Sequence, residues 1–88
     1  MKELAALKNL TKLDLSETKL TDAGLKELAK LQSLTTLELR SNPGVTDASV
    51  KELKQLKQLI TLDLRGTKVT NLGLHELRNA LPKCNIFD

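Results

Sequence analysis

The sequence predicts an α/β solenoid, in which similar strand-and-helix units stack around a leucine core. Leucine supplies 21 of the 88 residues and recurs in phase. The tripeptide Lys-Glu-Leu occurs at 2–4, 26–28 and 51–53, and His-Glu-Leu at 75–77 continues the series, so the period is 24 or 25 residues. Each unit contains apolar residues spaced by two and then by three. A repeat of this length is typical of solenoids, because one unit alone cannot bury its apolar faces.

The repeat divides one domain of 88 residues into five parts. Residues 1–9 match only the helical half of a repeat, and we expect a helix there that caps the stack. Because the chain starts in the middle of a repeat, we favour a fragment of a longer array over a complete short protein. The three repeats cover 10–33, 34–58 and 59–80, and a terminal segment covers 81–88.

Each repeat is expected to begin with a short strand. In Leu13-Asp14-Leu15 the leucines alternate with a polar residue, which is the pattern of a strand with one buried face. Residues 37–39 and 62–64 repeat this pattern. A charge at Leu37 would then lie in the buried face of the central strand, and we expect it to unfold the protein.

A helix is expected after each strand. Leu25, Leu28 and Leu31 are three residues apart, so they share one side of a helix. Thr21 is expected to cap this helix, and Asp22 then lies at the positive end of the helix dipole. Small residues at the same point of each repeat (Gly24, Ser49 and Gly73) indicate tight packing at the helix starts. The same cap recurs at Thr46-Asp47 and, without the charge, at Thr70-Asn71.

The terminal segment is expected to form a fourth, edge strand over residues 83–87. Leu81-x-x-Cys84-x-Ile86 copies the leucine spacing of the second repeat, which places Cys84 and Ile86 in the two buried positions of the strand. Pro82 precedes the strand, where it removes no ladder hydrogen bond. Cys84 is therefore expected to be a buried, unreactive thiol. We also expect the C-terminus to be a domain end.

The pattern LxxLxLxxTxL, followed by TDAGLKEL, closely resembles the leucine-rich repeat family; here it runs from Leu10 to Leu28. The Asp-x-Gly-Leu element is similar to the ribonuclease-inhibitor-like branch, and Thr18 is similar to the threonine of bacterial members. The resemblance implies a right-handed solenoid with a parallel sheet on the concave side and helices on the convex side. It also implies a non-enzymatic role in binding another macromolecule, most often a protein.

The residues that catalysis needs are scarce, and we expect no enzymatic activity and no cofactor. The chain has one histidine and one cysteine, and His75 replaces a lysine on the exposed side of a helix. A metal site is not expected, because single carboxylates on a flat sheet lack the six to eight oxygens that Ca²⁺ requires.

No apolar run approaches the roughly 18 residues of a membrane helix. With no secretion signal at residues 1–10, we expect a cytoplasmic protein that does not contact membranes.

The polar residues beside the strand leucines form the candidate partner-binding surface, which we name the sheet face. They are expected to point away from the core and to align in three rows across the sheet. Strands lie roughly 4.8 Å apart, so the carboxylates of the middle row repel one another, and two arginines can offset this repulsion through diagonal pairs. The three rows are Lys12, Thr36 and Thr61; Asp14, Glu38 and Asp63; and Ser16, Arg40 and Arg65.

Two further residues and one further column complete the expected surface. Asn85 and Phe87 are expected to extend the second and third rows on the edge strand. The column Thr18, Asn42 and Thr67 is expected to hydrogen-bond the turn backbone between repeats.

Three interpretations of the function remain open at this point. The sheet face binds a protein partner, or it is a solvated surface on a structural spacer or cap of a longer array. The third interpretation, nucleic-acid binding by the helix side, is disfavoured because glutamates interrupt its lysines and aromatic residues are absent there. The open edges of the sheet also favour self-association. The helix-side lysines are Lys2, Lys8, Lys26, Lys30, Lys51, Lys54 and Lys57.

Overall fold

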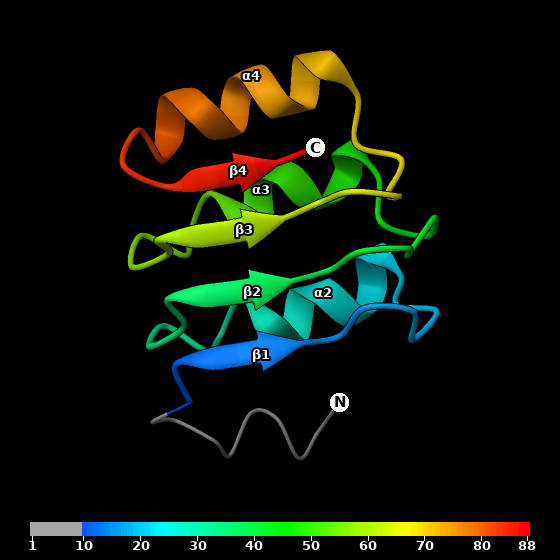
Figure 1. Cartoon of the computed structure of the whole chain (residues 1–88), viewed down its shortest axis with the longest axis horizontal. Helices are drawn as coiled ribbons and strands as arrows, with labels where there is room; N and C mark the ends of the chain where they lie inside the picture. The colour runs from blue at the N-terminus through cyan, green and yellow to red at the C-terminus, as the bar shows by residue number, and fades with distance from the viewer. Residues whose placement is uncertain (1–9) are drawn as a thin grey trace.

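The structure, a computed structural model, describes residues 10–88 and contains one parallel sheet. Its four strands lie in chain order: β1 (Lys12–Asp14), β2 (Thr36–Glu38), β3 (Thr61–Asp63) and β4 (Asn85–Phe87) (Figure 1). The predicted register is confirmed between β1, β2 and β3, where the central leucines pair with one another. The helix expected at residues 1–9 lies outside the described residues.

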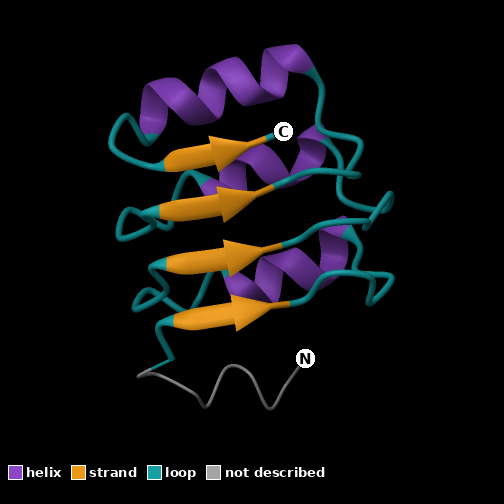
Figure 2. Ribbon diagram, viewed as in Figure 1, coloured by secondary structure: helices purple, strands orange, loops and turns teal. Residues whose placement is uncertain are grey.

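The helices follow the strands in the same repeating order (Figure 2). They are α2 (Asp22–Leu28), the 3₁₀ turn η1 (Asp47–Ser49) that continues into α3 (Val50–Leu53), and α4 (Asn71–Ala80). Thr21, Thr46 and Thr70 cap the three helical segments, and each threonine side chain accepts a backbone N–H of its first turn. The helix starts predicted from the sequence are therefore confirmed, and the fold is an α/β repeat solenoid.

The predicted register of β4 was wrong. Ile86 pairs with Leu62, and Asn85 pairs with Thr61, so Asn85 extends the first row of the sheet face. Phe87 extends the second row, not the third, because it lies beside the carboxylate of β3. The strand also starts at Asn85, two residues later than expected. The cause is a connection that is one residue shorter than in the second repeat: four residues lie between Leu81 and Ile86, whereas five lie between Leu56 and Leu62.

Cys84 consequently occupies a position in the turn, not in the strand. Its N–H donates to Leu81 O at 3.0 Å, as Leu59 N–H donates to Leu56 O at 3.1 Å one repeat earlier. Cys84 is half-buried, whereas Leu59 is buried, so the expectation of a fully buried thiol was wrong. Burial raises the pKa of the thiol, which keeps it protonated at neutral pH.

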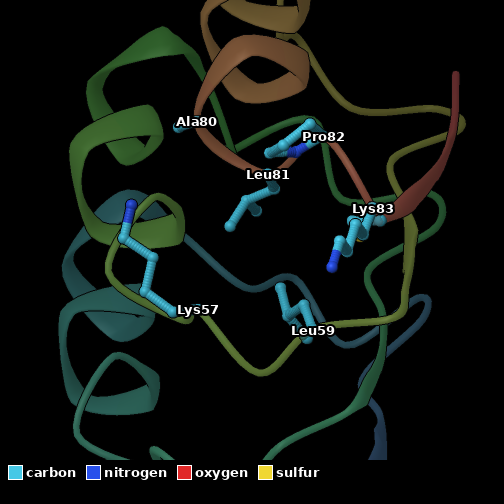
Figure 3. A pocket seen from close by; sticks show the side chains of 7 residues that line it. Lys57, Leu59, Ala80, Leu81, Pro82 and Lys83 are labelled. Atoms are coloured by element: carbon cyan, nitrogen blue, oxygen red, sulfur yellow. The ribbon is translucent and has the colours of Figure 1, made fainter.

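A small hollow of about 140 Å³ lies beside this cysteine (Figure 3). Cys84 has a smaller side chain than Leu59, its counterpart one repeat earlier, and both residues line the hollow. The hollow is mainly apolar. The residues that line it are Lys57, Leu59, Ala80, Leu81, Pro82, Lys83 and Cys84.

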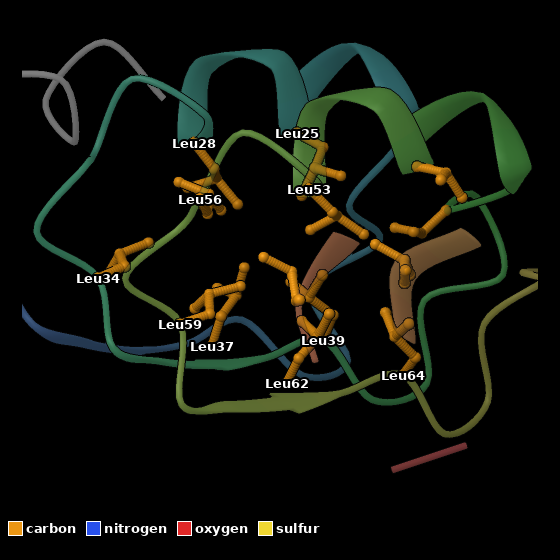
Figure 4. Packing of buried hydrophobic residues seen from close by; sticks show 14 of the residues in the cluster. Leu25, Leu28, Leu34, Leu37, Leu39, Leu53, Leu56, Leu59, Leu62 and Leu64 are labelled. Atoms are coloured by element: carbon orange, nitrogen blue, oxygen red, sulfur yellow. The ribbon is translucent and has the colours of Figure 1, made fainter. Parts of the chain in front are cut away.

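The core lies between the layer of strands and the layer of helices (Figure 4). Leu37 and Leu62 point inward from β2 and β3, and Leu25 and Leu53 point toward them from α2 and α3. These side chains are buried, in agreement with the predicted leucine pattern. Since the helices cover the inner face of the sheet, its outer face is left to the polar residues between the leucines.

The helix-start aspartates also connect one repeat to the next. The Asp22 carboxylate accepts hydrogen bonds from Thr46 N–H at 2.8 Å and from the Thr46 hydroxyl at 2.7 Å, and the Ser49 hydroxyl donates to it as well. Asp47 likewise accepts from Thr70 N–H at 2.7 Å and from the Thr70 hydroxyl. The sequence predicted only the dipole role of these aspartates.

Tight packing at the helix starts is confirmed at Gly73. A Cβ atom there would lie 2.5 Å from Oδ1 of Asp47 and 3.0 Å from Cγ1 of Val69. At the same point of the preceding repeat, Ser49 uses its hydroxyl to reach Asp22. A small residue at this position therefore lets the aspartate of the preceding repeat come close to the helix.

Asn42 forms a second link between the first two repeats. Its side chain is fully buried, and its Oδ1 accepts the N–H groups of Thr18 at 3.2 Å and Leu20 at 2.9 Å. Its Nδ2 donates to Leu15 O at 2.9 Å, Leu39 O at 3.0 Å and Arg40 O at 3.2 Å. The prediction that this column bonds the turn backbone between repeats is therefore confirmed at Asn42.

The side-chain hydroxyls of the two threonines in the same column bond within their own repeats. The Thr18 hydroxyl donates to Leu15 O, and the Thr67 hydroxyl donates to Leu64 O, both at 2.7 Å. A threonine side chain is shorter than asparagine and carries one donor instead of two. It closes its own turn and does not reach the neighbouring repeat.

Candidate functional site

The sheet face gathers all nine residues predicted for it. The register places Lys12, Thr36 and Thr61 in one row and Asp14, Glu38 and Asp63 in the next. Beyond the strands, Glu17 N–H donates to Arg40 O at 2.9 Å and Ser41 N–H donates to Arg65 O at 2.8 Å. These hydrogen bonds extend the parallel pairing beyond the ends of the strands, and they align Ser16, Arg40 and Arg65 as the third row.

Asp63 is the centre of this surface. Its carboxylate accepts from Nε of Arg65 at 3.0 Å, from Nη2 of Arg65 at 2.7 Å, and from the Arg65 backbone N–H at 3.1 Å. Nε of Arg40, on the neighbouring repeat, lies 3.5 Å from the same carboxylate. Only 5% of the Asp63 side chain is exposed. Two arginines therefore converge on one buried carboxylate.

These contacts govern the ionisation of Asp63. Hydrogen bonding from the Arg65 side chain outweighs the cost of burial, and it lowers the pKa of Asp63 below its ordinary 3.8. The same contacts raise the pKa of Arg65. Asp63 is therefore ionised throughout the neutral range, and its charge holds both guanidinium groups in place.

We expect the stability of the protein to fall as the pH drops below about 4. The pKa of Asp63 is lower in the folded than in the unfolded chain, so its contribution is present above pH 3.8 and is lost as the pH falls through the folded value. The pKa values of Asp14 and Asp22 are also lowered, so they act in the same direction. Thermal melts of wild type and Asp63→Asn between pH 2 and pH 6 would measure the effect. Asp63→Asn should flatten the profile, whereas the exposed Asp88→Asn should not; an unchanged slope in Asp63→Asn would contradict the assignment.

The rest of the acidic row differs from Asp63. Glu38 has Nη2 of Arg40 at 3.8 Å, a looser contact with both partners substantially exposed. Asp14 is exposed, and within residues 10–88 no Lys or Arg nitrogen lies within 4.0 Å of its carboxylate. Hydrogen bonding from Ser16 lowers the pKa of Asp14. The row therefore runs from an open carboxylate on β1 to a neutralised one on β3.

Phe87 belongs to this surface, in the second row and not in the third row where it was expected. It lies beside Asp63, and the guanidinium carbon of Arg65 is 5.8 Å from the centre of its ring. Phe87 is 48% exposed, so it adds an apolar area next to Arg65. The signal that could have placed it correctly is the five-residue step from Leu81 to Ile86.

The helix side carries charges that pair with one another. Lys30 contacts Glu27 at 3.3 Å, and Lys54 contacts Glu76 of the next repeat at 3.4 Å. His75 is exposed there, as predicted, and its Nε2 lies 3.2 Å from Nδ2 of Asn79. Exposed pairs of this kind contribute little to stability, and they reduce the positive charge that this side presents.

Between residues 10 and 88, no three His, Cys, Asp or Glu side chains converge in a way that could hold a metal ion. None of the helices in this range combines the length and apolar character that crossing a membrane requires.

Comparison with known proteins points to one family. A family model described as leucine-rich repeats, in two copies, matches residues 8–55, which is more than half of the chain. The fold is similar to a leucine-rich repeat protein of Leptospira interrogans, with 30% sequence identity and a TM-score of 0.65. The alignment covers 100% of this chain and 22% of that protein, so this chain spans about a fifth of its length. No curated protein matches the sequence.

Proposed function

The chain belongs to the leucine-rich repeat family, and on that premise we propose that it is a protein-binding module that docks its partner on the sheet face. Members of this family generally mediate protein–protein interaction. We also propose that it has no enzymatic activity of its own, because no group of His, Cys, Asp or Glu side chains in residues 10–88 could hold a metal ion, and because the chain has a single histidine and a single cysteine.

One observation carries the choice of surface. The helices pack on one side of the sheet, and the other side holds nine polar and charged side chains whose backbone is fixed by a continuous ladder. A rigid surface loses little conformational entropy when a partner binds. The helix side, in contrast, presents lysines of which Lys30 and Lys54 contact glutamates.

A second candidate function is a structural spacer or cap within a longer array. The pairing of Asp63 with Arg40 and Arg65 favours it, because these charges are satisfied without a partner. Under this candidate, the sheet face has no ligand, and substitutions on it affect only stability.

The test is a selection of binders from a random peptide display library against the whole chain. Reversing Arg40 and Arg65 to glutamate would be a poor probe, because it would place new carboxylates beside the buried Asp63. Thr36→Arg and Thr61→Arg instead add bulk to the outer face of β2 and β3 and bring no new carboxylate beside Asp63. The control adds the same residue at two exposed positions outside the sheet face, Gln55→Arg and Gln58→Arg.

We expect the threonine variants to weaken the selected binders by about tenfold or more and the glutamine variants to change affinity by less than about twofold. Binders that respond only to the glutamine variants would contradict the proposal, and so would a library that yields none. Affinity that collapses between about 50 and 200 mM salt would indicate a phosphate-binding surface instead.

A further inference from the structure

We infer that the sheet face recognises an acidic side chain together with an apolar side chain two positions away in an extended segment of a protein partner. The acidic side chain would bind between Arg40 and Arg65, and the apolar one would bind on Phe87. The inference rests on the proposed function and specifies the chemistry of the partner.

Asp63 positions the two guanidinium groups but is itself closed to a partner. Both of its oxygens contact arginine nitrogens, and 95% of its side chain is covered. The arginine side chains are far more open, with 44% of Arg40 and 57% of Arg65 exposed. The buried carboxylate therefore fixes two cationic groups whose outer edges remain in water.

The arginines retain hydrogen-bond donors for a ligand. A guanidinium group carries five N–H donors in a fixed fork. Arg65 directs Nε and Nη2 at Asp63, and Arg40 directs Nε at Asp63 and Nη2 loosely at Glu38. More than half of the donors of the pair are thus left over. A carboxylate matches this geometry, because its two oxygens accept two parallel N–H groups.

Phe87 supplies the apolar half of the surface. Its ring lies 5.8 Å from the guanidinium carbon of Arg65 and is about half exposed. Arg40 and Arg65 belong to the third row, but their guanidinium groups reach back to Asp63, which lies in the same row as Phe87. Along that row, the point midway between β2 and β3 is one and a half strand spacings from β4, or roughly 7 Å. Side chains at i and i+2 of an extended segment lie on the same side at nearly this separation, roughly 6.7 Å. In such a segment, an acidic side chain could therefore bind between Arg40 and Arg65 while an apolar side chain two positions away contacts the ring of Phe87.

The acidic row favours a protein over a nucleic acid as the partner. Glu38 lies within 4 Å of Arg40, and the open carboxylate of Asp14 follows on the next strand. A continuous line of phosphates would have to pass these carboxylates, whereas a single acidic side chain would not.

The experiment is an NMR titration of the whole chain with three capped peptides. The first is acetyl-Gly-Ser-Asp-Ser-Leu-Ser-Gly-amide; the second has Asn in place of its Asp, and the third has Gly in place of its Leu. The readout is the side-chain Nε–Hε signal of each arginine, and the chain has only three: Arg40, Arg65 and Arg78. Arg78 lies on α4, outside the sheet face, and serves as an internal control.

We expect the first peptide to shift the signals of Arg40 and Arg65 and to leave Arg78 unchanged. The Asn peptide should bind about tenfold more weakly or worse, and the Gly peptide about threefold more weakly. Phe87→Ala should remove the advantage of the leucine and keep that of the aspartate. Arg65→Lys keeps the charge but lacks the fork, and it should weaken the aspartate peptide several-fold.

Three results would overturn the inference: equal binding of the Asp and Asn peptides, no shift at millimolar peptide, or shifts at Arg78 alone. A failure here is separable from a failure of the proposed function. Display-selected binders that lack an acidic residue, yet are lost in Thr36→Arg, would refute this inference and leave the sheet face as the docking surface. An absence of binders that map to the sheet face would refute both.

Discussion

Replacing Leu37 with aspartate is expected to abolish cooperative folding. Leu37 is fully buried at the centre of β2, between Leu13 of β1 and Leu62 of β3. The substitution forfeits roughly 1.5–3 kcal/mol of apolar burial. It also places a carboxylate among leucines, where an unpaired charge costs several kcal/mol more. Because a domain of this size is stable by only about 5–15 kcal/mol, the sum is sufficient to unfold it.

Thermal and urea unfolding followed by circular dichroism would measure this loss. Thr36→Asp is the matched control, because it places the same charge one residue earlier, on the outer face of the same strand. The control should melt cooperatively, close to wild type. Equal stability of Leu37→Asp and Thr36→Asp would mean that the assignment of inner and outer faces is reversed.

Replacing Asn42 with alanine is expected to cost about 3–5 kcal/mol. Two of the backbone groups that bond to its side chain, Leu20 N–H and Leu39 O, do so at buried positions, and a buried group left without a partner costs roughly 1–3 kcal/mol. The Asn42 side chain serves five backbone groups, from Leu15 to Arg40, and it is fully buried. Alanine can neither accept nor donate at this place, and water has little access to it. The free energy of unfolding in urea would give the loss directly.

The neighbouring threonines provide the control for this measurement. Thr18 and Thr67 occupy the same column but each closes only its own turn. Thr18→Ala and Thr67→Ala should therefore cost about 1 kcal/mol each. If Asn42→Ala lowered the free energy of unfolding no more than Thr67→Ala does, the hydrogen bonds that Asn42 makes between repeats would not contribute to stability.

The leucine period was sufficient to predict the sheet, the helices and the rows of the sheet face. Pairing in a parallel sheet follows directly from the repeat, so Lys12, Thr36 and Thr61 could be aligned by counting residues. The same counting failed at β4, because the turn before Ile86 is one residue shorter and the repeat no longer fixes the register. The placement of Phe87 failed with it.

Contacts that depend on the direction of side chains could not be predicted. The sequence showed arginines beside an acidic row, but not that Arg40 and Arg65 would share Asp63 while Asp14 stays open. The hydrogen bonds that Thr46 and Ser49 donate to Asp22 join residues that are 24 and 27 positions apart. A single sequence reports the spacing of such residues but not the distance between their side chains.

The unequal links between repeats have a consequence for how the molecule comes apart. In a linear stack of repeats, each repeat contacts only its neighbours, so the repeats can separate one junction at a time. Both Asn42 and Asp22 form hydrogen bonds across the junction of the first two repeats. The next junction has Asp47 at the helix end, but Thr67 does not cross it at the turn. The junction between the second and third repeats should therefore open before the junction that Asn42 spans, so that β1 and β2 stay paired after β2 and β3 have separated.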